Sequence, residues 1–283
     1  MEPLSTEPII ISGKHQGILE DPSRLRTHII SALQSNILDR KIFPAGADRG
    51  PESSAVLFTL GICAVRGPSS SEICLILNKR SARVKQAGDL CFPGGGIAPR
   101  IDQIISRIIT LPMMPLGKWP HWGALLRERK NQARRLSVLL ATGIREGLEE
   151  MGLNPLRMDF LGPLPSQDLV MYRRTIYPMA TWITDQRRFH HNWEVEKVIY
   201  VPLMDLLSPD FYRRCSLVIG GSAADFPCFL YKGAEEEEIL WGATYRMVME
   251  FVRIVFQYEP PAVNELPPLE RSISREYLKA RRA

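Results

Sequence analysis

Three glutamates near the middle of the chain are the residues best suited to chemistry. Glu146, Glu149 and Glu150 stand at positions i, i+3 and i+4 of a segment with helical spacing. At about 100° per residue, Glu149 lies about 60° to one side of Glu146 and Glu150 about 40° to the other. The pattern predicts a helix that presents three carboxylates on one narrow stripe.

Such a cluster calls for a compensating cation. Like charges at this spacing cost roughly 0.2–0.5 kcal/mol per pair in an isolated helix, and the helix dipole also disfavours anions near the C-terminus. Clustered carboxylates suit Mg²⁺ or Mn²⁺, with water and substrate phosphate as further ligands. The alternative is a solvated acidic face neutralised by Arg145 and its neighbours. On the opposite side of the helix, Ile144, Leu148 and Met151 are expected to be buried.

A run of glycines upstream favours the metal hypothesis. Gly94, Gly95 and Gly96 follow Phe92 and Pro93 at the end of a predicted strand. Without side chains, backbone amides and carbonyls can approach a ligand closely, as a phosphate or metal site requires. Because a glycine triplet alone is usually only a turn, the hypothesis depends on the glycines and the acids together.

Hydrophobic patterns predict the elements that must position these residues. Ile101, Ile104, Ile105 and Ile108 follow the helical spacing of one buried face. Trp241 is expected in the core or a pocket wall rather than as a stacking platform, and the acidic run 235–238 is expected in solvent. Strands are expected at 55–65, 73–77, 89–92, around Phe160, at 175–183 and at 198–203. Helices are expected from Asp21 to Ile37, at 101–108, 124–151 and 239–257. The irregular mixture predicts an α+β fold.

Composition excludes several classes of protein. The 283 residues are 45% hydrophobic and 24% charged with a net charge of +5, which is typical of a globular chain. No apolar run approaches the ~18 residues of a membrane span, and no signal peptide is visible, so we expect a soluble, cytoplasmic protein without a membrane partner. The five cysteines lack C-x-x-C spacing and are expected to be reduced thiols.

The glycines and the acidic helix together resemble the Nudix hydrolase family. In its sequence box, Gly95 matches the opening glycine, and Arg145, Glu146, Glu149, Glu150, Gly152 and Leu153 match the closing half. About 36 residues are inserted between the two halves relative to the family, placing an insertion at about 99–138. Ile101 occupies the place of the first glutamate, with Asp102 one position later, and Gly147 replaces an apolar residue.

Other segments are similar to the coenzyme A pyrophosphatase subgroup of that family. They are 75–81 and 87–95 upstream of the acidic helix, and 194–203 and 239–244 downstream. Gln86 and Asp89 differ from the subgroup, which usually has His and Gln there.

The resemblance implies a Nudix-like α/β/α sandwich with a mixed sheet at 51–259. Residue patterns add an N-terminal extension, 1–50, with an amphipathic helix, and a charged tail, 260–283, that is expected to be loosely held. The resemblance also implies hydrolysis of the diphosphate linkage of a small nucleotide-like substrate, coenzyme A or an acyl derivative among the candidates, with Mg²⁺ or Mn²⁺ as cofactor. The implied metal ligands are Glu146, Glu149 and Glu150 with the Gly94 carbonyl, the implied general base is on the helix or is Glu194, and Arg145 braces the carboxylates. Arg80, Gly94 and Gly95 are the candidates to meet the substrate, with a merely solvated loop as the alternative for Arg80.

Two competing hypotheses remain. The insertion carries two tryptophans and a basic cluster that could form a lid, a homodimer surface or an RNA-binding surface: Trp119, Trp122, Arg127, Arg129, Lys130, Arg134 and Arg135. We do not expect a nucleic-acid partner, because these cations form no continuous helical stripe and the net charge is small. The last hypothesis is a Nudix-fold binding module without catalysis.

Overall fold

A strand that is buried on both faces lies at the centre of the fold. We analysed a computed structural model that describes residues 17–39, 43–65, 71–169, 173–186, 188–219, 222–233 and 236–269. In β1 (Ser53–Cys63), Ala55 and Leu57 join one hydrophobic cluster, while Val56, Phe58 and Leu60 join another. Since successive side chains in a strand point to opposite faces, β1 has a core on each side.

The sheet around β1 is mixed. β1 pairs in parallel with β7 and antiparallel with β2 and β4, and β3, β5, β6 and β8 complete the eight strands. The other strands of this sheet are β2 (Glu72–Arg80), β3 (Leu90–Cys91), β4 (Gly94–Gly96), β5 (Met158–Pro163), β6 (Gln167–Leu169), β7 (Arg174–Ile183) and β8 (Val195–Pro202). The predicted α+β fold is therefore confirmed.

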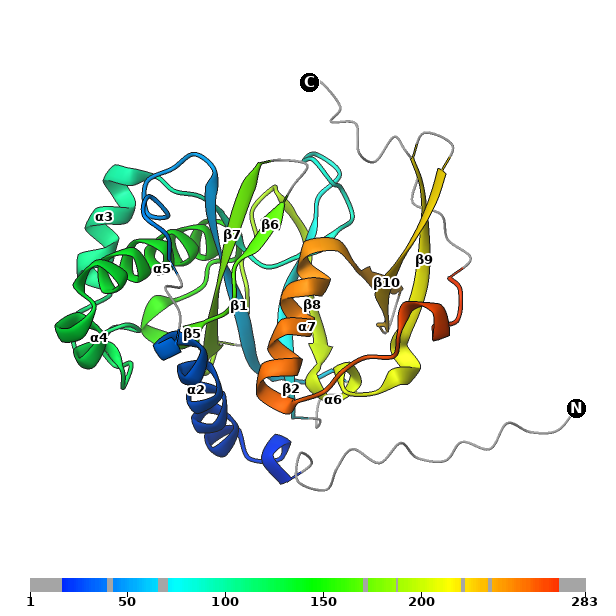
Figure 1. Ribbon diagram of the computed structural model, residues 1–283, viewed down its shortest axis with the longest axis horizontal. Coiled ribbons are helices and arrows are strands. Elements are labelled where there is room, and N and C mark those ends of the chain that lie inside the picture. Colours follow the sequence, from blue (N-terminus) through cyan, green and yellow to red (C-terminus); the bar gives the residue numbers. More distant parts are fainter. Residues whose placement is uncertain are drawn as a thin grey trace, which may run out of the picture.

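Helices cover both faces of the sheet (Figure 1). The long helix α5 (Lys130–Met151) packs on β1 from one side, together with α3 (Pro99–Ile108) and α4 (Trp122–Glu128). On the other side, α2 (Pro22–Asp39) contacts α7 (Gly242–Phe256). The short helix α6 (Leu203–Leu206) follows β8. The arrangement is a three-layered α/β/α sandwich.

The N-terminal helix agrees with its prediction. The side-chain oxygen Oδ1 of Asp21 accepts hydrogen bonds from the Ser23 and Arg24 amides at 2.9 and 3.1 Å, which caps α2. Leu25, Ile29 and Leu33 are completely buried. The side chain of Ile37 lies outside the described residues.

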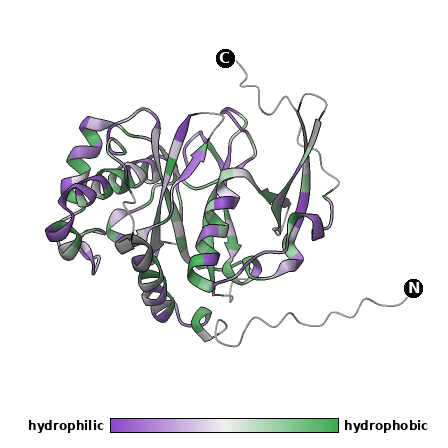
Figure 2. Cartoon of the chain, in the orientation of Figure 1, coloured by the Kyte–Doolittle hydropathy of each residue, from purple (hydrophilic) through white to green (hydrophobic). Residues whose placement is uncertain are grey.

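Three of the four isoleucines of α3, which were predicted to form a buried face, are exposed. Ile101 and Ile104 are 54% and 61% exposed, and Ile108 is exposed as well, whereas Asp102 and Ser106 are buried. Hydrophobic and hydrophilic residues alternate along this helix in Figure 2. The polar face of α3 points into the protein because the carboxylate of Asp102 accepts hydrogen bonds there.

The segment 124–151 forms two helices, one of the alternatives that its pattern allows. α4 and α5 meet at Arg129, and α5 ends at Gly152, whose φ of 65° is left-handed and favours glycine. Ile144 and Met151 are buried as expected. Leu148 was wrongly predicted to be buried, because it is 52% exposed, and Gly147 instead packs closely against Leu57.

A separate three-stranded sheet has no counterpart in the sequence prediction. It consists of β9 (Tyr212–Ile219), β10 (Ser222–Lys232) and β11 (Glu237–Leu240), and β11 occupies the expected start of the last helix. Glu238, in the acidic run expected to be solvated, is buried and paired with two lysines, Lys79 and Lys197.

The same sheet corrects the prediction for the cysteines. Cys215 and Cys228 are joined by a disulfide, whereas Cys63, Cys74 and Cys91 are free thiols. Antiparallel pairing of β9 with β10 brings the two bonded residues to neighbouring positions. Because neither strand was predicted, their proximity could not be foreseen.

The first part of the tail also packs against this sheet. Leu266 is buried, and the Arg214 amide donates to the Pro267 carbonyl at 2.9 Å, so 260–269 is held more firmly than expected. The rest of the tail, 270–283, lies outside the described residues. In the part of the chain that is described, no helix has the length and apolar character needed to cross a bilayer.

Candidate functional site

The fold brings the distant glycine run against the acidic helix. The glycines form β4, which pairs with the beginning of β1. A side chain at Gly94 would overlap the β1 backbone at Ala55 and Val56, and one at Gly95 would overlap the carboxylate of Glu146. The close pairing of β4 with β1 therefore requires glycine at position 94, whereas a side chain at position 95 would displace the Glu146 carboxylate.

Arg145 links the acids to both β4 and α3. Its guanidinium donates to Asp102 Oδ1 at 2.8 Å, Glu146 Oε1 at 2.9 Å and the Gly96 carbonyl at 3.0 Å, with a longer contact of 3.4 Å to Glu149 Oε2. The ion pairs raise the pKa of Arg145 against the opposing effect of burial. This network holds two of the three glutamates beside the glycine strand.

Asp102 is a structural residue that the sequence prediction did not assign. It is completely buried and accepts hydrogen bonds from the Ala98 amide and the Thr142 hydroxyl, both at 2.7 Å, as well as from Arg145. Its place one residue beyond the expected box glutamate was the available signal. The carboxylate explains why the polar face of α3 points inward.

Glu150 is in a different environment from its neighbours. Its side chain accepts a hydrogen bond from Asn78 Nδ2 at 2.8 Å and a weak one from the Gly94 amide at 3.5 Å. Burial is the largest cause that raises the pKa of Glu150 to about 8, and the nearby Glu146 adds to the shift. Burial also raises the pKa of Glu146, while Arg145 opposes that change. A cation near these carboxylates would favour their charged forms.

Glu194 lies close enough to this group to affect it. Its negative charge contributes to the raised pKa of Glu150. The loop before β8 is tied to the end of α5, because the Asn192 amide donates to the Glu150 carbonyl at 3.0 Å. The Glu194 carbonyl accepts from the Ser81 amide at 2.8 Å. Four acidic residues named from sequence thus gather around one end of α5.

The chemistry of these donors fits a hard divalent cation. Carboxylate oxygens predominate, and Asn78 Oδ1, beside Glu150, is buried and has no hydrogen-bond partner in the described part of the chain. Among the described residues, however, no three His, Cys, Asp or Glu side chains converge into a ready metal-binding group. Arg145 is bound to Glu146 and Glu149, so a metal ion would compete with its guanidinium for these oxygens.

A cavity of about 600 Å³ opens beside the glycine strand. Arg80, Gly94 and Gly95, which were predicted to meet a substrate, line it together with Arg174 and Arg246, which were not. The other lining residues are Ser54, Val56, Gln86, Asp89, Leu90, Cys91, Phe92, Asp168, Leu169, Ile176, Trp241, Gly242, Ala243, Thr244 and Met247. Trp241 is therefore a pocket-wall residue, as predicted.

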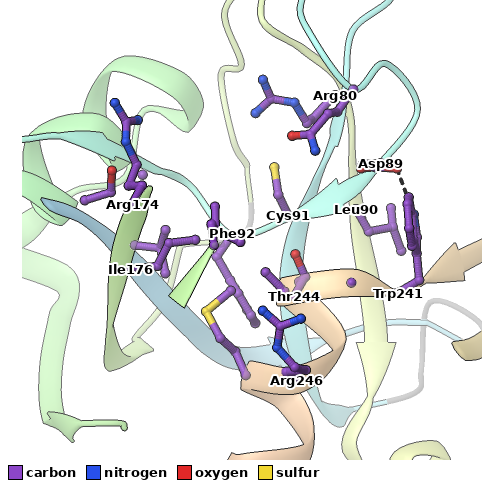
Figure 3. A pocket seen from close by; sticks show the side chains of 18 of the residues that line it. Arg80, Asp89, Leu90, Cys91, Phe92, Arg174, Ile176, Trp241, Thr244 and Arg246 are labelled. Carbon is purple, nitrogen blue, oxygen red and sulfur yellow. Dashed lines mark hydrogen bonds between the residues drawn. The ribbon is translucent and has the colours of Figure 1, made fainter. Parts of the chain in front are cut away.

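The three arginines of the cavity are available to an anion. Arg80 Nε donates to the Lys85 carbonyl at 2.8 Å, Arg174 to the Pro51 carbonyl at 3.4 Å, and Arg246 to Gln167 and the Asp168 carbonyl. None of them pairs with a carboxylate of the described residues. Figure 3 shows them spaced around the cavity. Periodicity could not reveal Arg174 and Arg246, because they come from β7 and α7, far from the box.

The basic cluster of the proposed insertion is partly used within the fold. Arg134 Nη2 lies 2.6 Å from Asp48 Oδ2, and Arg135 donates to the Phe43 carbonyl at 3.0 Å. Asp48 is buried, and the bond from Arg134 helps to lower its pKa against the effect of burial. These two arginines hold the segment at 43–50 on α5, which leaves fewer cations for an RNA surface.

Comparison with known proteins finds similarity to proteins that are named Nudix hydrolases. No protein-family profile matches the chain. In sequence it is 28% identical over 137 residues to "Nudix hydrolase 22, chloroplastic" of Arabidopsis thaliana. That alignment covers 46% of this chain and 44% of the plant protein, so the chain matches less than half the length of this relative.

Several solved structures that are weakly similar to this chain are also named Nudix hydrolases or Nudix domains. A Nudix hydrolase from M. Smegmatis, RenU, is 13% identical, with coverages of 57% of this chain and 75% of that one and a TM-score of 0.34. A Nudix hydrolase from Alicyclobacillus acidocaldarius is 16% identical, with coverages of 54% and 80% and a TM-score of 0.34. The NUDIX domain of Shewanella oneidensis NrtR, complexed with ADP ribose, is 14% identical, with coverages of 62% and 85% and a TM-score of 0.32.

Proposed function

We propose that the chain is a Nudix-type pyrophosphohydrolase that uses Mg²⁺ or Mn²⁺ to cleave the diphosphate linkage of a nucleoside diphosphate conjugate. One observation carries the proposal: an acidic helix lies against a glycine strand at the edge of a cavity lined by three arginines, none of which pairs with a carboxylate of the described residues. Acids that attract a metal and arginines that attract phosphate are complementary to a metal-bound diphosphate. The similarity to the plant Nudix hydrolase supports the same class.

In this proposal Glu146, Glu149 and Glu150 hold the metal, with the Gly94 carbonyl as a further donor. The metal would neutralise diphosphate charge and lower the pKa of a bound water. Binding would replace the proton that Glu150 retains near neutral pH, since burial has raised its pKa to about 8. Metal affinity should therefore increase with pH through this range.

The other residues of the site bind, orient and accept protons. Arg145 acts as a positioning residue, because its bonds run to Asp102, Glu146 and the Gly96 carbonyl. Arg80, Arg174 and Arg246 would bind the phosphates or other anionic groups of the substrate from the cavity walls. A carboxylate on α5 or Glu194 would accept the proton of the attacking water.

Coenzyme A and its acyl derivatives are one substrate hypothesis, which rests on the subgroup resemblance of 75–81 and 87–95. ADP-ribose is another, since it is the ligand named for the NrtR domain. A cavity of about 600 Å³ is of suitable size for a nucleotide. A homodimer and a cytoplasmic location remain predictions.

A substrate screen tests the proposed function. The purified chain is incubated with coenzyme A, ADP-ribose, diadenosine polyphosphates and nucleoside triphosphates, with Mg²⁺, Mn²⁺ or EDTA, and products are identified by mass spectrometry. We expect two phosphorylated products from at least one diphosphate conjugate, and none in EDTA. Failure of the whole panel under all metal conditions would contradict the proposal.

A binding module without catalysis is the second candidate, favoured by one feature of the site. Arg145 occupies Glu146 and Glu149, and no complete metal-binding group is formed among the described side chains. This candidate predicts that a nucleotide of the panel binds but is recovered intact in Mg²⁺ and Mn²⁺. Calorimetry on the same samples distinguishes the two candidates.

A further inference from the structure

Large apolar side chains are exposed together on one short stretch of the chain. Of the ten such side chains that are exposed among the described residues, five lie within 101–113. Ile101, Ile104 and Ile108 of α3 are 54%, 61% and 45% exposed, and Leu111 and Met113 of the following loop are 55% and 76% exposed. Single exposed apolar residues are ordinary, whereas a group of them marks a surface that binds a partner.

The three isoleucines form one row along α3. At about 100° per residue they fall within an arc of about 60°, on the side of the helix away from the buried Asp102 and Ser106. Arg100 and Arg107 are exposed as well, and both lie within about 60° of Ile104 on the same projection. The outer face of α3 therefore combines an apolar row with two cations at its border.

The orientation of this face is fixed by the fold. Asp102 accepts hydrogen bonds from the Thr142 hydroxyl and the Ala98 amide, so turning the isoleucines inward would break both bonds. The loop after the helix is held as well, because the Leu116 amide donates to the Ile109 carbonyl at 3.0 Å. The apolar side chains are therefore presented to solvent by an ordered surface.

The same part of the chain carries an excess of positive charge. Residues 99–138 contain eight Lys and Arg side chains but only two carboxylates, so their net charge of +6 exceeds the +5 of the whole chain. Figure 1 shows α3 and α4 at the same side of the molecule, outside α5. Four cations of this region are exposed and have no ion-pair partner among the described residues: Arg100, Arg107, Arg127 and Lys130.

An anionic lipid bilayer is complementary to both features of this face. The apolar side chains of a surface helix enter the boundary between headgroups and acyl chains, and cations beside them attract anionic lipids. RNA would pair with the cations but would leave the isoleucine row in water. A two-fold contact between two copies of the chain would cover the isoleucines but would bring their arginines together.

We propose that the outer face of α3 and the loop 111–113 bind the surface of a membrane that contains anionic phospholipids. The isoleucine row enters the headgroup region, and Arg100 and Arg107 contact lipid phosphates. The contact is peripheral, because α3 has 10 residues and is too short to span a bilayer. Our sequence-based expectation of no membrane partner considered only spanning segments, and this inference departs from it.

Flotation of the full chain with lipid vesicles tests the inference. One set of vesicles is phosphatidylcholine alone, and the other contains about 30% phosphatidylserine, which gives the surface its negative charge. At about 0.15 M salt we expect at least about tenfold more binding to the anionic vesicles, and about 0.5 M salt should reduce that binding. Substrate and metal are left out, so the result does not depend on the proposed function.

Matched variants separate the apolar and the charged parts of the face. Ile104→Ser should weaken binding to anionic vesicles at least about fivefold, whereas Leu156→Ser, at a 65% exposed position outside the insertion, should leave it unchanged. Arg107→Gln should weaken binding about fivefold, and Arg83→Gln, at another exposed position, by less than about twofold. Because all four side chains are exposed, the melting temperature should change little in each variant.

Four results would overturn the inference. Three of them come from flotation: no binding to anionic vesicles, equal binding to both kinds of vesicle, and binding that neither Ile104→Ser nor Arg107→Gln weakens. The fourth comes from light scattering without lipid. A dimer that Ile104→Ser converts to a monomer would assign this face to a second copy of the chain.

Discussion

The two ends of the candidate site differ in how their charged side chains are paired. At the acidic end, Arg145 connects Asp102, Glu146 and Glu149 in one network, so the carboxylates are positioned before any ligand arrives. At the cavity end, Arg174 and Arg246 contact carbonyl and amide oxygens but no described carboxylate. The difference suggests that the first end is organised by the protein itself, whereas the second is left free for an anionic ligand.

The acidic end should show the largest effect. Glu149→Gln removes a charge from the proposed metal ligands, and we expect hydrolysis in Mg²⁺ or Mn²⁺ to fall at least about 100-fold. Glu149 is largely exposed at the helix surface, so the melting temperature should change little. Glu128→Gln, at an exposed position on α4, is the matched control. Full activity of the Glu149 variant would remove this residue from the mechanism.

The two faces of α3 provide the next comparison. Asp102→Ala leaves the Arg145 guanidinium, the Thr142 hydroxyl and the Ala98 amide without their buried acceptor. We expect a loss of about 3 kcal/mol in the free energy of unfolding, measured by urea denaturation. On the opposite face, Ile104→Ala should change it by no more than about 0.5 kcal/mol. Similar losses in both variants would contradict the orientation of the helix.

The cavity end should affect substrate binding more than turnover. We expect Arg246→Ala to raise KM about tenfold and to change kcat by less than about twofold, because an exposed cation contributes mainly to binding. Steady-state kinetics with the substrate found in the screen measures both constants. Arg127→Ala, on α4 and outside the cavity, serves as the control. A fall in kcat without a change in KM would mean that Arg246 contributes to turnover, as proposed for the acidic end, and not to substrate binding.

The buried carboxyl group of Asp89 should make the stability of the protein depend on pH. Burial raises the pKa of Asp89 from the usual 3.8 to about 7, although the hydrogen bond from Trp241 and the charge of Arg80 oppose the shift. Its stabilising contribution is therefore complete below pH 4 and is lost as pH rises through about 7. Relative to Asp89→Asn, the intact protein should therefore lose unfolding free energy as the pH rises between these limits. Parallel pH profiles of the two proteins would contradict this shift.

Sequence patterns predicted the regular elements well where one periodicity dominated. Leu25, Ile29 and Leu33 predicted α2 because their spacing coincides with a continuous buried face. The isoleucines of α3 follow the same spacing, yet the prediction that they are buried was wrong. Periodicity shows only how apolar residues align, and it does not show that hydrogen bonds from three donors hold Asp102 inside the protein. The strands β9 and β10 were missed, and with them the disulfide, because their pairing depends on long-range contacts.

The candidate site was predictable to the extent that it lies in short motifs. Gly94, Gly95 and the glutamates of α5 could be named, although about 50 residues separate the two groups. Arg174, Arg246 and the contact between Asp89 and Trp241 could not be derived from spacing. They lie around one cavity because β7, the start of α7 and the loop before β3 all contribute residues to its walls, which only the tertiary structure reveals.

A crystal structure with Mn²⁺ and a non-hydrolysable ADP analogue tests the central claim most directly. The anomalous signal of manganese gives the position of the metal independently of the ligand. We predict manganese between Glu146, Glu149 and Glu150, with the diphosphate extending from it toward the arginines of the cavity. Manganese bound elsewhere, or a diphosphate outside this cavity, would contradict the account.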